Sequence, residues 1–330
     1  ERHILVEKGD ATYQFGIDYL RDVWYSTSYL LDRKQSMNGC AKKRFENYKK
    51  QPLEFVFDKS FTGKLSQFGL NPDRRTPTGI KAAIIREKGT NGEREMAYML
   101  YLAGFDVKDV TMTDLVSGRE TLEDINFIVF CGGFSNSDVL GSAKGWAGAF
   151  LFNPKAKAAL DNFYARKDTL SLGVCNGCQL MIELNLINPD FTKKAKMLHN
   201  DSHKFESKFV GVTVPMNRSV MFGSLSGSKL GIWVAHGEGK FSLPYHEDKY
   251  NVVLKYSYDE YPGNPNGSDY SVAGLASPDG RHLAMMPHLE RSCFPWQNAY
   301  YPADRIKNDQ ITPWMEAFVN ARKWIEMNKK

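Results

Sequence analysis

Residues 169–181 read Thr-Leu-Ser-Leu-Gly-Val-Cys-Asn-Gly-Cys-Gln-Leu-Met, and this stretch decides how the rest of the chain is interpreted. An apolar run fit for a buried strand leads into Gly-x-Cys-x-Gly, and a helical pattern follows at once. The flanking glycines allow a sharp turn that lifts the thiol of Cys175 above a sheet edge, next to a helix N-terminus that favours thiolate. The segment therefore predicts a nucleophilic cysteine, with the backbone N–H of Asn176 directed at a developing oxyanion. The alternative interpretation is a buried core cysteine.

A nucleophilic cysteine needs a base, and the base needs a group that orients it. An apolar run that starts at His282 ends at Pro287, and His288 and Glu290 follow two positions apart. In an extended chain these two side chains project to the same side, so the carboxylate can hold one imidazole nitrogen while the other faces Cys175. The predicted catalytic residues are Cys175, His288 and Glu290.

A Gly-Gly pair follows another apolar run, at residues 124–131. Gly132 and Gly133 would let backbone N–H groups approach a ligand, and we interpret them as the second part of an oxyanion hole, although a plain tight turn is the alternative. In open parallel sheets the ligand crevice lies outside the carboxyl ends of the strands. Cys131, Cys175 and Pro287 all fall at such ends in this interpretation.

From residue 80 onward, short apolar runs alternate with helical patterns. The expected strands are 80–86, 105–110, 124–131 and 169–174, and the expected helices are 91–104, 147–166 and 176–186. This alternation predicts an α/β fold with an open, mostly parallel sheet flanked by helices. The later half is richer in expected strands, at 209–214, 230–235, 251–258, 270–276 and 282–286, before a closing helix at 312–328.

Residues 1–79 have a different pattern and are predicted to form a separate region before the domain at 80–330. We expect a helix at 18–33, a polar, Lys-rich passage, a short strand at 53–57 and a Pro- and Gly-containing linker at 71–79. The sequence does not begin with Met, and its start suggests a piece of a longer polypeptide.

Composition narrows the class of protein. The chain has 330 residues, 42% hydrophobic and 13% aromatic, with a net charge of +5, which is enough apolar material for a core. It has no run of about 18 apolar residues, no secretory signal and no basic motif interleaved with aromatics, so neither a membrane nor a nucleic acid is expected as partner. Five cysteines, an odd number, argue against a disulfide framework and for the cytoplasm.

Two other kinds of site fit the cysteine pair less well. Cys175-x-x-Cys178 followed by His199 and His203 superficially fits zinc, but the spacer is too long for the finger pattern. A redox pair is also disfavoured, because the flanking Trp and Pro of thioredoxin-like proteins are absent. We therefore expect no metal site.

Together these motifs resemble those of class I glutamine amidotransferases, whose fold is flavodoxin-like. Gly-Gly-Phe-Ser at 132–135, His-Gly-Glu-Gly at 236–239, Asn-Pro-Asn-Gly-Ser at 264–268 and Met-Met-Pro-His at 285–288 narrow the resemblance. They are similar to the glutaminase domains at the carboxyl end of large, single-chain phosphoribosylformylglycinamidine synthases of purine biosynthesis. Residues 80–330 match the glutaminase domain, and residues 1–79 look like the tail of the preceding synthetase region.

The resemblance implies that L-glutamine is hydrolysed through a Cys175 thioester to glutamate and ammonia. Ammonia would then convert formylglycinamide ribonucleotide to formylglycinamidine ribonucleotide at the synthetase site. It further implies substrate-binding roles for Phe134, Gln179, Phe205, Glu206 and His236. These residues would need no cofactor, whereas ATP and Mg²⁺ are expected in the synthetase region, the remainder of the same polypeptide and the acceptor of the ammonia.

Two alternatives stay open at this point. One is a stand-alone Cys-His-Glu hydrolase of the peptidase or γ-glutamyl hydrolase type. The other is a non-catalytic binding domain that keeps the scaffold, against which the intact set of Cys175, His288 and Glu290 argues.

Overall fold

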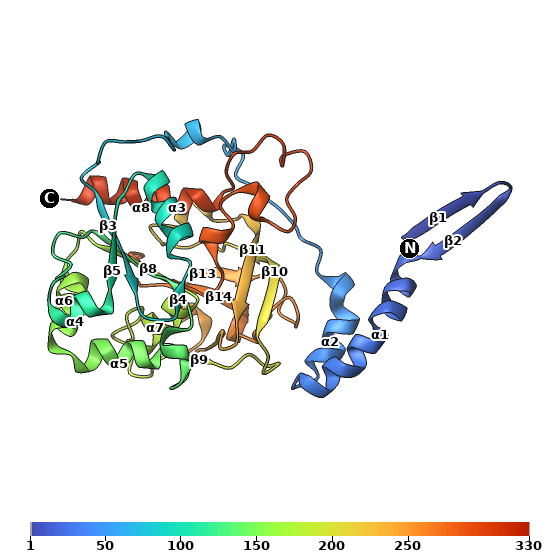
Figure 1. Ribbon diagram of the computed structural model, residues 1–330, viewed down its shortest axis with the longest axis horizontal. Helices are drawn as coiled ribbons and strands as arrows, with labels where there is room; N and C mark the ends of the chain where they lie inside the picture. The colour runs from blue at the N-terminus through green and yellow to red at the C-terminus, as the bar shows by residue number, and fades with distance from the viewer. Residues whose placement is uncertain (1, 330) are drawn as a thin grey trace.

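A nine-stranded sheet forms the centre of the computed structural model, which describes residues 2–329 (Figure 1). Its strand order is β11-β10-β13-β14-β15-β8-β6-β3-β5. The five strands at one end are mutually parallel: β15 (His282–Met285), β8 (Leu170–Val174), β6 (Phe127–Phe130), β3 (Lys81–Arg86) and β5 (Asp106–Thr111). Every residue of β6, β8 and β15 is buried, as expected for parallel strands covered on both faces.

The other strands extend the sheet in antiparallel fashion. They are β14 (Val272–Ala276), β13 (Asn251–Tyr256), β10 (Glu206–Thr213) and β11 (Lys229–His236). The sheet is therefore parallel where strands alternate with helices in the sequence, and antiparallel where strands follow one another directly. The predicted α/β class with a flanked, largely parallel sheet is confirmed.

Helices cover both faces of the parallel strands. The helices are α3 (Glu93–Ala103), α4 (Met112–Ser117), α5 (Lys144–Phe152), α6 (Pro154–Ala165), α7 (Asn176–Glu183) and α8 (Trp314–Asn328). Helix α3 packs beside α8 on one face, and α5 packs beside α6 and α7 on the other (Figure 1).

The single helix expected at 147–166 is two helices. Asn153 is extended, and its side chain accepts hydrogen bonds from the backbone N–H groups of Lys155 and Ala156 at 3.1 and 3.0 Å. Pro154 occupies the first position of α6, where it has no N–H to lose. The cap and the proline together end α5 and start α6.

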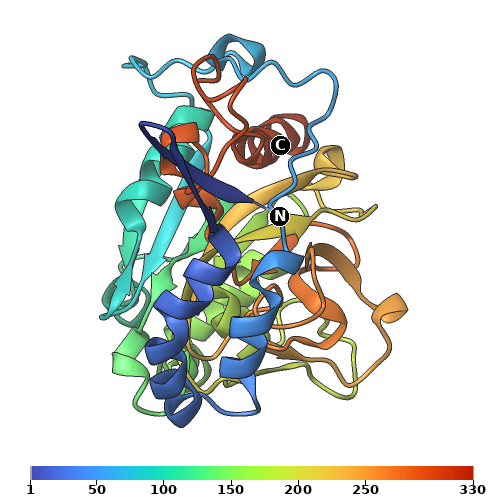
Figure 2. The same ribbon diagram turned by 90° about the vertical axis from the view of Figure 1, so that its right-hand side faces the viewer.

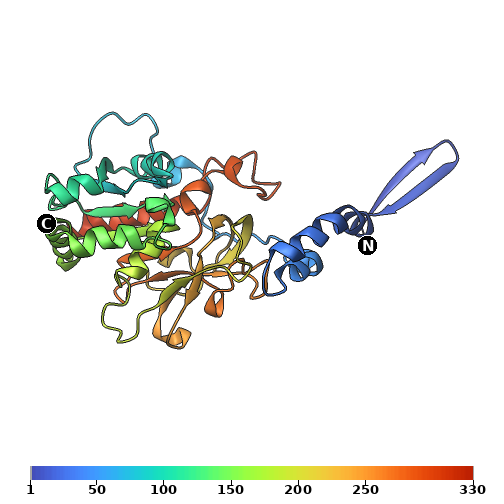
Figure 3. The ribbon, with the colours of Figure 1, turned by 60° about the horizontal axis from the view of Figure 1, so that its bottom comes forward.

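The N-terminal region extends away from the body as a hairpin and two helices (Figures 1 and 3). Strands β1 (His3–Lys8) and β2 (Ala11–Gly16) form the hairpin, α1 (Ile17–Gln35) follows it, and α2 (Cys40–Asn47) packs against α1. Helix α1 confirms the helix expected at 18–33. The hairpin and α2 were not predicted, because their sequences lack strong periodicity and α2 lies inside the Lys-rich passage.

Residues 51–79 run along the body as an extended strap before β3 begins (Figure 1). The strand expected at 53–57 is a single bridge, in which Val56 and Lys229 exchange backbone hydrogen bonds of 2.8 and 3.1 Å. Phe55 and Phe57 pack against the ring of Tyr301. The strap is held to the domain by these contacts.

Between residues 2 and 329, the structure has no helix with the length and apolar character that crossing a membrane requires. All five cysteines are free and buried.

Candidate active site

Cys175 stands at the sharp bend between β8 and α7. Its φ of 52° and ψ of −105° lie in a region that L-residues rarely adopt, which marks a strained position. The glycines on either side are required by packing, since a Cβ on Gly177 would lie 2.0 Å from the carbonyl oxygen of Phe130 and one on Gly173 would lie 2.5 Å from that of Gly177. The Gly-x-Cys-x-Gly pattern thus forms the elbow that the sequence predicts.

The neighbouring strand delivers the other two predicted catalytic residues. Strand β15 pairs in parallel with β8, and its Met285 carbonyl accepts a 2.9 Å hydrogen bond from the Cys175 N–H. His288 follows three residues later, and its Nδ1 donates to Glu290 Oε1 at 2.7 Å. Both side chains are almost fully buried, so this charge-assisted contact is shielded from water.

The imidazole of His288 faces Cys175 and is held in its cationic form. Burial of the ring lowers its pKa, but the Glu290 carboxylate and hydrogen bonds to Cys175 and Glu290 outweigh that effect and raise the pKa of His288 to about 10. The thiol also contacts the carbonyl oxygen of Ala235, 3.5 Å from Sγ. The three side chains therefore form one connected set, as a nucleophile, a base and an orienting acid would.

The backbone of Gly132 and Gly133 passes directly beside this set. A Cβ on Gly132 would lie 2.8 Å from His288 Cε1 and 3.4 Å from Cys175 Cβ, so only glycine fits there. Gly133 has a φ of +120°, which favours glycine, and pairs with Thr90 in a short bridge. The structure thus places Gly132, Gly133 and Asn176 around the thiol, where backbone N–H groups could stabilise an oxyanion.

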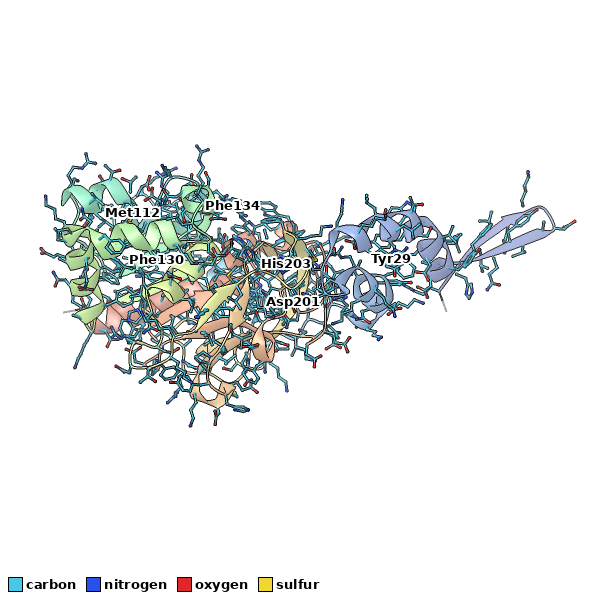
Figure 4. All side chains as sticks on the ribbon, turned by 90° about the horizontal axis from the view of Figure 1, so that it is seen from below. Tyr29, Met112, Phe130, Phe134, Asp201 and His203 are labelled. Atoms are coloured by element: carbon cyan, nitrogen blue, oxygen red, sulfur yellow. The ribbon has the colours of Figure 1, made fainter. Side chains whose placement is uncertain are left out.

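A cavity of about 220 Å³ opens onto Cys175. Of the residues assigned to substrate binding from the sequence, Phe134, Gln179, Phe205 and His236 line it. The rings of Phe134 and Phe205 are half-exposed and lie 5.8 Å apart. In Figure 4, Phe134 lies on the body, on the side that carries His203, which also lines the cavity.

Glu206 does not line this cavity. Its buried carboxylate accepts hydrogen bonds from Ser202 and Tyr261 at 2.6 and 2.9 Å, and it pairs with Lys208 at 2.6 Å and Arg44 at 3.4 Å. These partners hold the Glu206 carboxylate on the side of the fold that faces the N-terminal helices, away from the cavity.

Two carboxylates that the sequence analysis did not single out line the cavity. Asp138 Oδ1 is buried with no hydrogen-bond partner among the described residues, and burial together with the nearby Glu238 raises the pKa of Asp138 to about 6. One oxygen of Glu238 accepts a 3.3 Å hydrogen bond from the Ser142 N–H. Glu238 belongs to the His-Gly-Glu-Gly motif at 236–239, so the sequence could have indicated it as a site residue. Asp138 lies in a loop without a motif of its own.

His236 is a neutral imidazole at the cavity wall. It is 2% exposed, and neither of its ring nitrogens has a hydrogen-bond partner among the described residues. Burial and the neighbouring positive charge of His288 lower the pKa of His236 to about 3. An unpaired polar ring in such a place is costly unless a ligand or water satisfies it.

Gln179 and Asn176 connect the elbow to its neighbours. Asn176 Nδ2 donates to Gln179 Oε1 at 2.9 Å, and Asn176 Oδ1 accepts from the Ser135 N–H at 3.1 Å. Gln179 Nε2 donates to the Glu238 carbonyl at 2.8 Å. These bonds use both ends of the Gln179 carboxamide, so this side chain braces the cavity wall.

The second cysteine of the pair is not part of the site. Cys178 is fully buried on α7, and burial raises the pKa of its thiol well above the usual range. Across residues 2–329, no group of three or more His, Cys, Asp or Glu side chains is arranged to hold a metal ion.

The chain is similar in sequence to glutamine amidotransferase domains and to phosphoribosylformylglycinamidine synthases. Residues 79–325 match the family of CobB/CobQ-like glutamine amidotransferase domains. The chain is 40% identical to a probable phosphoribosylformylglycinamidine synthase, chloroplastic/mitochondrial, of Arabidopsis thaliana over 93% of its own length, and 40% identical to phosphoribosylformylglycinamidine synthase of Homo sapiens over 92%. It spans about a quarter of the length of each relative: 23% and 24%, respectively.

Among solved structures, a chain in the structure of PurLQS from Thermotoga maritima is similar, with 27% identity and a TM-score of 0.56. The similarity covers 76% of this chain and 99% of that one.

Proposed function

Because the chain belongs to the family of CobB/CobQ-like glutamine amidotransferase domains, we propose that it hydrolyses L-glutamine at Cys175 and supplies the ammonia to a synthetase site. The observation that carries the proposal is the convergence of Cys175, His288 and Glu290 on the Gly132–Gly133 backbone at the mouth of a cavity. This combination of nucleophile, base, orienting acid and backbone donors suits acyl transfer from an amide.

The reaction begins from an ion pair: because the pKa of His288 is raised to about 10, the imidazole already holds the proton of the Cys175 thiol, which is present as a thiolate. The thiolate attacks the carbon of the glutamine side-chain amide, and the oxyanion that forms is stabilised by backbone N–H groups at Gly133 and Asn176, each worth about 3 kcal/mol. The imidazolium of His288 then protonates the departing nitrogen, and ammonia leaves behind a thioester on Cys175. His288 next accepts a proton from water, the hydroxide attacks the thioester carbon, and glutamate and the free thiol are released.

The cavity has charges suited to the head group of a free amino acid. Asp138 and Glu238 both line the cavity and lie close enough to interact, so they attract an α-ammonium group, and the imidazoles of His199 and His203, which also line it, can donate hydrogen bonds to an α-carboxylate. The unpaired ring nitrogens of His236 are available to bond the bound substrate. This arrangement favours glutamine itself over a glutamine residue inside a peptide, whose α-amino and α-carboxyl groups are in amide bonds.

The relatives named as phosphoribosylformylglycinamidine synthases suggest the use of the ammonia. We expect it to convert formylglycinamide ribonucleotide to formylglycinamidine ribonucleotide in the synthetase region of the same polypeptide, which would need ATP and Mg²⁺. The cytoplasm remains the location that we expect. The likeness to such long relatives favours this role over the stand-alone hydrolase considered from the sequence.

The N-terminal region offers a surface for the synthetase region. It carries exposed large apolar side chains on the hairpin and on α1, here called the N-terminal apolar surface: Ile4, Leu5, Val6, Tyr13, Phe15, Tyr19, Leu20, Val23, Trp24, Leu30 and Leu31. Such a density of exposed apolar groups marks an interaction site. Because the relatives are about four times as long as this chain, the synthetase region is the partner that we assign to it.

The test is ammonia release by the full-length protein supplied with glutamine. Cys175→Ala is expected to lower kcat by at least about a thousand-fold, because no other group can form the thioester. Cys178→Ala, one helical turn further along, is the matched control and should keep kcat within about three-fold while losing some stability. Ammonia release that survives Cys175→Ala would overturn the proposal.

A further inference from the structure

The loop at residues 199–206 lies between the cavity and the N-terminal helices. On its inner side, His199, His203, Lys204 and Phe205 line the cavity. On its outer side it is hydrogen-bonded to the turn between α1 and α2. Figure 2 shows these two helices side by side in front of the body. Figure 4 shows Asp201 and His203 where the body meets the helices that carry Tyr29. One short loop therefore has the substrate site on one side and the N-terminal region on the other.

The turn between α1 and α2 donates hydrogen bonds directly to backbone carbonyls of the loop. The N–H of Met37 donates to the carbonyl of Ser202 at 3.0 Å, and Asn38 Nδ2 donates to the carbonyl of Asp201 at 2.8 Å. Bonds to main-chain carbonyls fix the path of the loop itself, whereas side-chain contacts would fix only the ends of flexible groups.

A buried charge network reinforces this attachment. Asp32 on α1 is 6% exposed, and its carboxylate contacts Arg44, accepts from Ser36 Oγ at 2.6 Å and pairs with Lys204 Nζ at 3.3 Å. Burial opposes ionisation, but Ser36, Arg44 and Lys204 together lower the pKa of Asp32, so the carboxylate is charged at neutral pH. Removing such a carboxylate leaves Arg44 and Lys204 without their shared partner, which is costly in a buried site.

The loop is in turn bonded to the catalytic wall. Asn200 is fully buried, and its Nδ2 donates to the carbonyls of Lys204 at 2.9 Å and His236 at 2.7 Å. Its Oδ1 accepts from the N–H of Gly239 at 3.0 Å, and its own N–H donates to the carbonyl of Gly237 at 2.9 Å. Through Asn200, the loop and residues 236–239 are held as one unit beside Cys175.

We propose that the turn between α1 and α2 positions the cavity wall for glutamine, with Asp32 as the positioning residue. Asp32 touches no reacting atom and acts through Lys204 and Arg44 on the loop. This inference rests on the proposed function, since it assigns a control of affinity to the same cavity. A partner that displaces the two helices would change the affinity for glutamine without touching the catalytic residues.

The test compares two aspartates of the same helix in the full-length protein. Asp32→Asn removes the charge that holds the loop, while Asp18→Asn is the matched control, because Asp18 pairs with Lys49 at 2.8 Å, Tyr48 and Arg2, all within the N-terminal region. We expect Asp32→Asn to raise the KM for glutamine about ten-fold with kcat changed less than about two-fold. Asp18→Asn should leave both constants unchanged, and Asp32→Glu should restore most of the KM.

A second measurement separates positioning from general damage. A diazoketone analogue of glutamine must occupy the cavity before it alkylates Cys175, whereas iodoacetamide needs only a reactive thiol. Asp32→Asn is expected to slow labelling by the analogue about ten-fold at low concentration and to leave the iodoacetamide rate within about two-fold of the wild type.

Three outcomes overturn the inference. The first is a KM for Asp32→Asn that equals that of Asp18→Asn, and the second is a parallel loss of kcat and iodoacetamide reactivity. In both of these the wild type still releases ammonia, so the proposed function stands. The third is a wild type that neither releases ammonia nor reacts with the analogue, which overturns the proposed function and the inference together.

Discussion

The two parts of the chain hold their shapes in different ways. In the domain, the strands that carry the site are buried at every position, and one continuous set of buried apolar side chains surrounds them. In the N-terminal region, every residue of β1 is exposed and α1 buries only Asp32, while Trp24 is 78% exposed. The domain has its own core, whereas the hairpin and α1 place apolar groups where only another surface could bury them.

This difference suggests that the domain holds the reacting groups, whereas the N-terminal region attaches to another surface. The proposed catalytic residues depend on buried charges and on backbone positions that allow no side chain, and such features need a rigid surrounding. The N-terminal region reaches the site through a few hydrogen bonds around Asp32, Met37 and Asn38. Substitutions in the two parts should therefore have different consequences.

Among the substitutions that compare the two parts, the largest effect on activity is expected at Glu290. Glu290→Gln removes the charge that stabilises the imidazolium of His288, so kcat for ammonia release should fall by about a hundred-fold or more. Glu7→Gln, on the exposed hairpin, should leave kcat unchanged. Steady-state ammonia assays on both variants check this, and equal activity of the two would break the distinction between the two parts.

Removing a large apolar side chain should destabilise the domain much more than the N-terminal region. Phe130→Ala empties a fully buried position beside Trp146 and Phe150 and should cost about 3–5 kcal/mol in the free energy of unfolding. Trp24→Ala in this 330-residue chain alone should cost less than about 0.5 kcal/mol. Denaturant titration measures both, and a cost of several kcal/mol for Trp24→Ala would show that this side chain is already buried in solution.

The smallest effect is a dependence on pH. Burial and Glu238 raise the pKa of Asp138 to about 6, so lowering the pH through 6 protonates the carboxylate that we propose attracts the α-ammonium of glutamine. We expect kcat/KM for glutamine to fall about ten-fold per pH unit below 6. Above pH 6, where Asp138 is ionised, kcat/KM should no longer depend on the protonation of this carboxylate.

Asp138→Asn provides the control for this pH dependence. It should show a low kcat/KM near neutral pH and lose the fall near pH 6. Its stability should be equal or higher, because folding raises the pKa of Asp138 and its ionised form therefore costs stability at neutral pH. An unchanged pH profile in Asp138→Asn would exclude Asp138 from substrate binding.

The sequence predicted the elements whose periodicity comes from burial in the domain. The runs predicted at 124–131 and 169–174 contain the buried strands β6 and β8, and Gly132 and Cys175, which follow these runs, lie together at the carboxyl ends of the strands. This placement could be inferred because parallel strands end together. In the antiparallel half, individual strands could be predicted but their order in the sheet could not, because that order depends on side chains far apart in sequence.

The hairpin and the roles of Glu206 and Asp138 could not be predicted, because no pattern in the neighbouring sequence indicates them. The hairpin at 3–16 has no buried face, and its alternation is limited to the short stretch Thr12-Tyr13-Gln14-Phe15, which is too short to predict a pair of strands. The role of Glu206 depends on Arg44, which lies 162 positions earlier. Asp138 has a raised pKa only because folding brings Glu238 near it. Contacts of this range require the folded chain.

The most direct test of the central claim is to trap the acyl intermediate. The full-length protein is mixed with glutamine, quenched in acid and digested, and the peptide that contains both Cys175 and Cys178 is fragmented in a mass spectrometer. We predict a γ-glutamyl group on Cys175 that is absent from Cys175→Ala. A γ-glutamyl group found on Cys178, or on neither cysteine while ammonia is still released, would contradict the account.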